Sequence, residues 1–215
     1  MTARDRAVGA LVGLACGDAL GTTVEFARPG SFAPLADMVG GGPFGLPKGA
    51  WTDDTSMAMC LAESVLDRGD LDAADQLRRY LLWRGEGYWS STGECFDIGN
   101  ATSAALHRFA VTGATTDAVV DDEAAANGSL MRLAPVPIRW WRDPQQAAER
   151  SAESSRTTHA AARPVDACRL LGAVLARLIG GDDFDALFDG DATQWGIGHP
   201  GVAALARGEI GRAHV

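Results

Sequence analysis

The feature that most constrains the fold of this 215-residue chain is the spacing of its apolar residues, which recur with the period of an α-helix. Alternating β-branched or aromatic runs, which are typical of strands, are nearly absent. Six helices are predicted, over Asp5–Leu20, Thr52–Arg68, Asp72–Arg84, Asn100–Val111, Pro144–Thr157 and Pro164–Ile179. We therefore predict an all-α domain built as a compact multi-helix bundle.

The composition, 47% hydrophobic and 22% charged residues, is ordinary for a soluble globular protein. A net charge of −9 disfavours a protein that follows nucleic-acid phosphates along a groove, and equally disfavours an anionic membrane surface. A single nucleotide remains possible as a ligand, because local backbone donors or a metal ion can hold phosphate within an acidic protein. We expect a monomer that binds neither a nucleic-acid groove nor a membrane.

The N-terminal apolar run, Ala7–Gly21, has some features of a signal sequence. It is short and rich in glycine, it is preceded by Asp5, and it contains Asp18. No stretch is expected to reach the length of a transmembrane helix. The four cysteines, Cys16, Cys60, Cys95 and Cys168, are widely spaced without a pair typical of a zinc site. Three of them lie in apolar helical contexts, where a free thiol is usually buried. We expect a reduced, cytoplasmic protein.

The triplet Thr52-Asp53-Asp54 opens the second predicted helix. Threonine is a good N-cap and acidic residues are favoured in a first turn, so a purely structural role is possible. Asp54, however, falls on the apolar stripe with Ala58 and Leu61, and an ionised carboxylate facing a core needs a partner. A hydroxyl and two carboxylates are hard oxygen ligands that suit Mg²⁺, Mn²⁺ or Ca²⁺. Further ligands would have to come from elsewhere.

Other polar residues near predicted helix ends have ordinary structural interpretations. Asp18 is a turn-forming or capping residue by default, and Glu25 a solvated loop residue. Asp97 lies just ahead of a helix as a plausible cap. His159 lies between two helices, where a histidine more often makes structural hydrogen bonds than performs catalysis.

The tripeptide Asn127-Gly128-Ser129 precedes an apolar stretch. Asn127 or Ser129 would simply cap a helix in the first interpretation. In the second, the N–H groups of Gly128, Ser129 and Leu130 would hold a phosphate at a helix N-terminus. The local sequence is compatible with both.

Five stretches, taken in order, resemble the ADP-ribosylglycohydrolases, the group that includes dinitrogenase reductase-activating glycohydrolase. They read GLACGDALGTTVEF, WTDDTSMAM, FDIGNATSAAL, NGSLMRLAPV and THAAA, and they extend from the first helix to about Ile179. The motif TDDT followed later by NGSLMR is quite specific to this family. The resemblance implies an all-α fold with a cleft that holds two Mg²⁺ or Mn²⁺ ions.

The resemblance also implies roles for individual residues. Thr52, Asp53 and Asp54 would be metal ligands. Glu25 would be the catalytic base close to the metals and the reacting ribose, with Asp97 as the second candidate. The nucleotide would be bound by the loop and the histidine that match the family's pattern, namely Asn127, Gly128, Ser129, Met131 and His159.

The implied activity is metal-dependent hydrolysis of the glycosidic bond between ADP-ribose and a modified protein side chain or small acceptor. Such a reaction passes through an oxocarbenium-like transition state. The expected partner is an ADP-ribosylated protein or a small-molecule ADP-ribose conjugate. The rival is a non-catalytic ADP-ribose-binding module of the same fold. A metal phosphohydrolase, which would release AMP or phosphate, is a third alternative.

One departure concerns the end of the chain. The family closes its metal site with a late GGDTDT-like motif, whereas the nearest text here, GGDDFDA at Gly180–Ala186, lacks the threonines and comes early. The final residues, Glu209–Val215, spell EIGRAHV, which is what a common sequencing-library adapter encodes when translated. We therefore expect residues 1–208 to be a domain incomplete at its C-terminus, residues 209–215 to be non-native, and this chain to be a poor enzyme.

Overall fold

The computed structural model describes residues 1–116, 120, 125–184, 187 and 192–208. The terminal segment 209–215 and part of the GGDDFDA stretch therefore lie outside the described residues. The described part is all-α, as predicted, and its single extended pairing is an isolated bridge between Gly41 and Leu46. Its helices are α1 (Ala3–Gly21), α2 (Asp53–Arg68), α3 (Ala73–Glu86), α4 (Asn100–Thr112), α5 (Pro135–Trp140), α6 (Pro144–Arg156), α7 (Ala162–Gly180) and α8 (Pro200–Ala206).

All six predicted helices are confirmed, and each observed end lies within two residues of the expected one. Local capping explains this agreement. Asp72 and Asp143 accept hydrogen bonds from the first turns of α3 and α6, and α2 ends at Gly69 in the left-handed conformation. The helices α5 and α8 were not predicted, because each is too short to establish a helical period.

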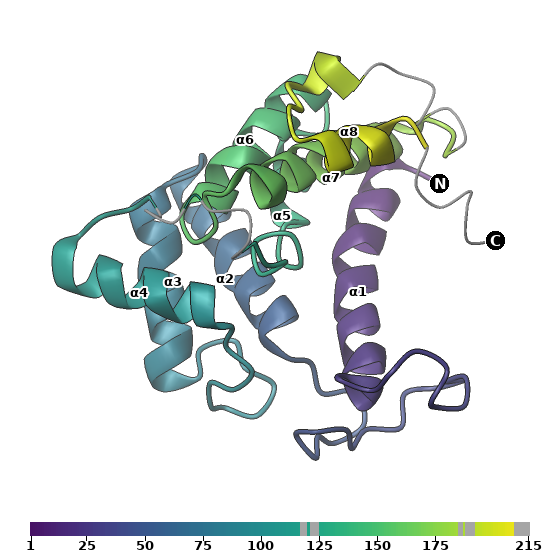
Figure 1. The fold of residues 1–215 in the computed structure, drawn as a ribbon, viewed down its shortest axis with the longest axis vertical. Helices are drawn as coiled ribbons and strands as arrows, with labels where there is room; N and C mark the ends of the chain where they lie inside the picture. Colours follow the sequence, from purple (N-terminus) through teal and green to yellow (C-terminus); the bar gives the residue numbers. More distant parts are fainter. Residues whose placement is uncertain (117–119, 121–124, 185–186, 188–191, 209–215) are drawn as a thin grey trace.

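Helix α2 is the centre of the fold and contributes to two hydrophobic clusters (Figure 1). On one side Leu61 and Val65 pack with residues of α5, α6 and α7. On the other side Met57 and Cys60 pack with side chains of α3 and α4, including Tyr80. Burial on both sides fixes the direction in which the first turn of α2 points.

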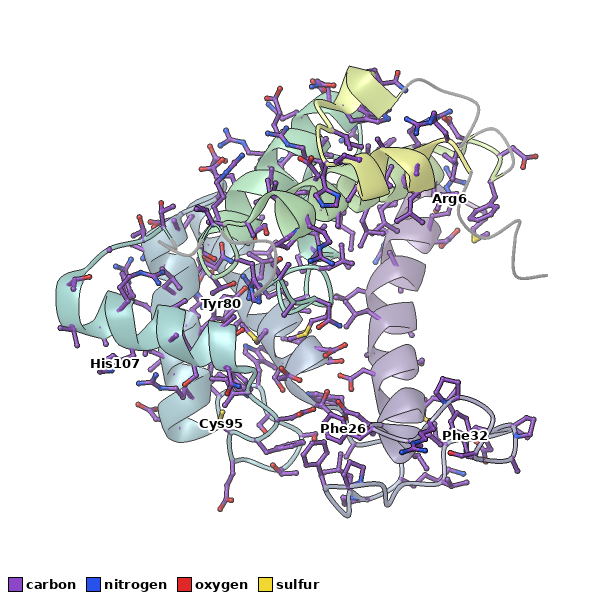
Figure 2. All side chains as sticks on the ribbon, in the orientation of Figure 1. Arg6, Phe26, Phe32, Tyr80, Cys95 and His107 are labelled. Carbon is purple, nitrogen blue, oxygen red and sulfur yellow. The ribbon has the colours of Figure 1, made fainter. Side chains whose placement is uncertain are left out.

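Helix α1 stands at the edge of this core and meets the rest of the molecule near its two ends (Figure 1). At its N-terminal end, Arg6 donates a hydrogen bond from Nε to the Ile179 carbonyl of α7 at 2.8 Å (Figure 2). Only Ala19 of α1 is buried. Cys16 is exposed, whereas Cys60 and Cys168 are buried, so the expectation of a buried thiol is wrong for Cys16.

Helix α1 and the turn that follows it, Ala3–Val24, are long and apolar enough to cross a membrane by length and composition, with a mean hydropathy of 1.5. The expectation that no stretch reaches this length is therefore wrong. The core helix of a soluble protein and a signal sequence share both properties. Length and composition alone do not place α1 in a membrane.

Candidate active site

Asp18, near the C-terminal end of α1, caps the start of α2. Its carboxylate accepts the backbone N–H of Thr52 at 3.0 Å and the Thr52 hydroxyl at 2.8 Å. It also accepts the backbone N–H and the hydroxyl of Thr55, at 3.0 and 2.6 Å. Thr52 occupies the N-cap position, but its own side chain makes no capping bond. The capping role that Thr52 could have had thus belongs to a residue of another helix.

Four carboxylates line one cavity of about 380 Å³ in front of this cap. Asp53 and Asp54 come from the first turn of α2, Glu25 follows the short 3₁₀ turn after α1, and Asp97 precedes α4. Asp97 does not cap α4, whose N-cap is Gly99, and its φ of 59° is uncommon for a residue with a side chain. Segments far apart in the chain therefore bring these acids together.

The carboxylates of α2 lie where their charged forms are disfavoured. Burial raises the pKa of Asp53 to about 8, and the charges of Asp54, Asp97 and Asp18 add to that shift. Burial also raises the pKa of Asp54 to about 6, with Asp18 and Glu25 contributing. Mutual repulsion in a partly buried cavity costs free energy unless protons or a bound cation reduce the negative charge.

Glu25 and Asp97 share a hydrogen bond. Burial raises the pKa of Asp97 to about 7, and the charge and the hydrogen bond of Glu25 raise it further. The pKa of Glu25 is also raised by burial, but the bond from Asp97 opposes that change. The pair is therefore suited to holding one proton on Asp97 while Glu25 remains a carboxylate, an arrangement that separates an acid from a base.

The facing wall of the cavity comes from the first turn of α4, from the segment around Asn127 and from the segment that follows α6. Its residues include Asn100, Thr102, Asn127, Gly128, Met131 and His159. Glycine is required at position 128, because a Cβ there would lie 2.8 Å from Cε1 of His159. Of the residues that the resemblance assigned to the nucleotide, Ser129 alone is absent from this wall. Its buried hydroxyl accepts a hydrogen bond from Ser155 at 2.8 Å.

No helix begins at Asn127 in the described structure, so the expected helix N-terminus is wrong. The Asn127 carbonyl accepts the N–H groups of Leu130 and Met131, at 2.8 and 3.1 Å, which closes a turn. The N–H of Leu130 is therefore not free to hold a phosphate. Within the described residues, the N–H groups of Gly128 and Ser129 make no hydrogen bond. Both sequence interpretations began a helix here, whereas the structure has a turn whose Gly128 lies against the His159 ring.

His159 is buried beside this turn, with Nδ1 2.8 Å from the Thr158 hydroxyl oxygen. Its backbone N–H donates to the Ser155 carbonyl at 2.8 Å, so the backbone of His159 is held by the end of α6. Burial lowers the pKa of His159 to about 4, and the charge of Arg132 adds to the effect. The imidazole is therefore neutral at physiological pH.

Hard oxygen donors fit Mg²⁺ or Mn²⁺ in this cavity. The Thr52 hydroxyl donates its hydrogen to Asp18, which leaves its lone pairs available to a cation, and Asp53 and Asp54 adjoin it. The side chains are nevertheless not gathered around one point: the described residues contain no group of three His, Cys, Asp or Glu side chains placed to hold a metal ion. The donor chemistry fits a cation, whereas a complete ligand set is absent from the described part.

The sequence interpretation missed Phe26, whose side chain is 78% exposed at the cavity rim beside Glu25. Its φ of 62° turns the chain sharply after the acid. The ring packs edge-on against Phe44 at 6.4 Å, and Phe44 lies 5.4 Å from Phe96. Figure 2 shows Phe26 and Cys95 at the same end of the molecule. Phe26 and Phe44 lie 18 positions apart on the connection between α1 and α2, and Phe96 lies on the connection between α3 and α4, so no local pattern could have identified this rim.

Residues 1–211 match the ADP-ribosylglycohydrolase family. The chain is 44% identical over 184 residues to ADP-ribosylarginine hydrolase Tri1 of Serratia proteamaculans, and 36% identical over 181 residues to ADP-ribosyl-[dinitrogen reductase] glycohydrolase of Rhodospirillum rubrum. These alignments cover 86% and 82% of this chain, but 50% and 59% of the two relatives. The chain thus spans about half the length of the curated relatives it matches.

A solved structure described as an ADP-ribosylglycohydrolase-related protein complex has the same fold. It superposes with a TM-score of 0.79 at 39% sequence identity, over 97% of this chain and 68% of that chain.

Proposed function

Because the chain belongs to the ADP-ribosylglycohydrolase family, we propose that it carries the acidic active site of a hydrolase that cleaves ADP-ribose from an arginine side chain. The observation that carries the proposal is the cavity in which Glu25 and Asp97 share a hydrogen bond beside Asp53 and Asp54. Arginine is proposed as the acceptor because the Serratia relative is an ADP-ribosylarginine hydrolase. The partner would then be an ADP-ribosylated protein.

Glu25 is proposed as the general base that takes a proton from the attacking water. Asp97, which holds a proton more tightly, would keep Glu25 in place and return a proton to the leaving group. The raised pKa of Asp97, about 7, supports this division because a catalytic acid works best when its pKa is near the working pH. Two carboxyl groups in different protonation states are what glycosidic-bond hydrolysis commonly uses.

Thr52, Asp53 and Asp54 would hold Mg²⁺ or Mn²⁺. A divalent ion supplies Lewis acidity and orients hydroxyl groups of a sugar. Asp18 would support this site by fixing the Thr52 side chain through the bond at 2.8 Å. A pair of ions is proposed for the whole protein, with the ligands of the second ion coming from outside the described residues.

Asn127, Gly128, Met131 and His159 would bind the diphosphate and its neighbouring ribose. Support comes from their place in the cavity wall and from the N–H groups of Gly128 and Ser129, which have no acceptor among the described residues. Backbone N–H groups of this kind can bind an anion within an acidic protein.

The test is to incubate a protein ADP-ribosylated on arginine with Mg²⁺ or Mn²⁺ and either this chain or a version extended to the length of the Serratia relative. Mass spectrometry then identifies the products. Free ADP-ribose together with unmodified arginine supports the proposal. Release of AMP or phosphate would indicate a phosphohydrolase. Retention of ADP-ribose without any product from the extended protein would indicate a binding module.

A further inference from the structure

Arg132 is a fully buried cation behind the Asn127 turn, and it does not line the cavity. Its guanidinium lies 4.7 Å from the centre of the Tyr80 ring, in the interior of the molecule (Figure 2). Its Nε has no hydrogen-bond partner, and within the described residues no carboxylate forms an ion pair with it. A role limited to packing would be filled at lower cost by an apolar side chain.

The donors of Arg132 point to the two segments that form the nucleotide side of the cavity. Nη1 donates to the Gly128 carbonyl at 3.1 Å. Nη2 donates to the Thr158 hydroxyl at 2.8 Å and to the Thr157 hydroxyl at 3.3 Å. A single planar group therefore fixes both the turn and the residue that contacts the His159 ring.

The hydrogen-bonding capacity of Thr158 determines which nitrogen of His159 carries the hydrogen. A guanidinium can only donate, so the bond from Arg132 occupies a lone pair of the Thr158 oxygen. The hydroxyl hydrogen is then free to be donated to Nδ1, 2.8 Å away. Arg132 also polarises this hydroxyl and makes it a stronger donor. Nδ1 is the acceptor that this hydrogen has among the described residues, so the arrangement that satisfies both groups places the hydrogen of a neutral imidazole on Nε2.

His159 lines the cavity, and its Nε2 is not among the buried side-chain atoms that lack a hydrogen-bond partner, so we take Nε2 as the ring nitrogen that is accessible from the cavity. A Cβ built on Gly128 would lie 3.2 Å from Nε2, and both residues line the cavity. Nε2 has no hydrogen-bond partner in the part of the chain that the structure describes. An Nε2–H group there would offer a hydrogen bond to an oxygen of a bound anion.

We propose that Arg132 is a positioning residue, which acts through Thr158 to hold His159 as the tautomer whose Nε2–H faces the cavity. The tautomer assignment is independent of the reaction, whereas ADP-ribose as the ligand rests on the function proposed above. The other tautomer would present a lone pair to the phosphate oxygens and repel them.

The test uses Thr158→Val, which removes the hydroxyl with little change of volume, and Thr158→Ser, which restores it. Thr157→Val is the matched control, because Thr157 is an adjacent buried threonine that contacts the same Arg132 nitrogen but not the ring. The ¹⁵N shifts of the histidine rings report the tautomer, and His159→Gln identifies the signals of His159. Calorimetry with ADP-ribose and Mg²⁺ reports the affinity, and circular dichroism checks folding.

Wild type and Thr158→Ser should show a single Nε2–H tautomer at neutral pH. Thr158→Val should lose this preference and bind ADP-ribose about tenfold more weakly, the change expected for one hydrogen bond to a charged acceptor. Thr157→Val should keep the tautomer. An Nδ1–H form in the wild type, an unchanged tautomer in Thr158→Val, or the same change in Thr157→Val would overturn the assignment.

The two proposals can fail separately. If the tautomer follows Thr158 as expected but the wild type does not bind ADP-ribose, the positioning role stands and the proposed ligand is wrong. Arg132→Gln should also release the tautomer, but it can unfold the turn, so the folded Thr158→Val variant carries the decision.

Discussion

The Asp18 carboxylate accepts the Thr55 hydroxyl hydrogen bond at 2.6 Å, although the two residues belong to different helices. Asp18 lies near the C-terminal end of α1, where a negative charge is disfavoured by that helix, and at the N-terminus of α2, where it is favoured. The hydrogen bonds to the first turn of α2 therefore offset an unfavourable position. This contact holds α1 to the acidic cavity.

Asp18→Ala should lower the free energy of unfolding by about 2–3 kcal/mol, because it leaves the N–H and hydroxyl groups of Thr52 and Thr55 without their charged acceptor. Asp72→Ala, which removes a cap that serves a single N–H of α3, should cost about 1 kcal/mol. Urea denaturation followed by circular dichroism measures both. Equal losses would show that the Asp18 contact is no more than an ordinary cap.

The helices were predictable because their signals are local, whereas the partners of the site residues were not. The apolar stripe of α2 identified Asp54 as a misplaced carboxylate from neighbours within a few turns. The bond between Asp18 and Thr52 joins residues 34 positions apart, and no local pattern records it. Likewise, the turn at Gly128 lies against His159, a residue 31 positions later in the chain. The glycines of α1 are typical of a closely packed helix, yet much of α1 is exposed in the structure.

Asp53→Asn and Asp54→Asn should each lower the affinity for Mg²⁺ or Mn²⁺ by at least tenfold while keeping the helical content. Each variant loses one anionic ligand, and the remaining carboxylate is relieved of a repelling neighbour. Titration calorimetry and the electron paramagnetic resonance of Mn²⁺ measure the binding. Asp75→Asn is unsuitable as a control because its carboxylate bridges Arg68 and Arg79, so the exposed Asp70→Asn serves instead. Unchanged affinity in both site variants would contradict the metal assignment.

Without a divalent ion, the free energy of unfolding should fall as the pH rises from about 6.5 to 8.5. Asp53 and Asp97 have pKa values of about 8 and 7 in the folded chain, against an ordinary value of 3.8, so the folded state binds more protons in this range. The protonated forms stabilise the fold at the lower pH, and that contribution is lost as the pH passes through these values. His159, whose pKa is lowered to about 4, is neutral in the folded chain throughout this range. In the unfolded chain, at its ordinary value of 6.5, it is half protonated at the lower limit, so it makes a small opposite contribution that is confined to that limit.

The decline should be on the order of 1–3 kcal/mol, and Asp53→Asn should flatten it. Mg²⁺ should stabilise the protein more at the upper pH, where the carboxylates are ionised. Urea midpoints measured at several pH values with and without Mg²⁺ test this. A flat wild-type profile without Mg²⁺ would mean that the cavity acids are not destabilised by one another.

Glu25→Gln in the extended protein should reduce turnover by about 10²–10⁴ while sparing ADP-ribose binding, as expected for the loss of a general base. Asp97→Asn removes the proposed proton donor, so it should also lower turnover, and it should shift the pH dependence of turnover because Asp97 influences the protonation of Glu25. Steady-state rates of ADP-ribose release across pH separate the two. Near-normal turnover in Glu25→Gln would transfer the role of base to Asp97.

The sequence predicts a monomer, but the exposed apolar residues of α1 predict instead that the 215-residue chain self-associates through this helix. Val8 and Val12 lie one helical turn apart and are 55% and 53% exposed. Between them, a Cβ built on Gly9 would meet no heavy atom within 4 Å, so another helix could approach this face closely. The pair Val8→Glu and Val12→Glu should shift the chain toward the monomer in analytical ultracentrifugation without loss of helical content. Leu66→Glu, at an exposed site on α2, is the matched control and should leave the association unchanged. If Leu66→Glu disperses the chain as well as the α1 pair does, net charge rather than the apolar face of α1 governs the association.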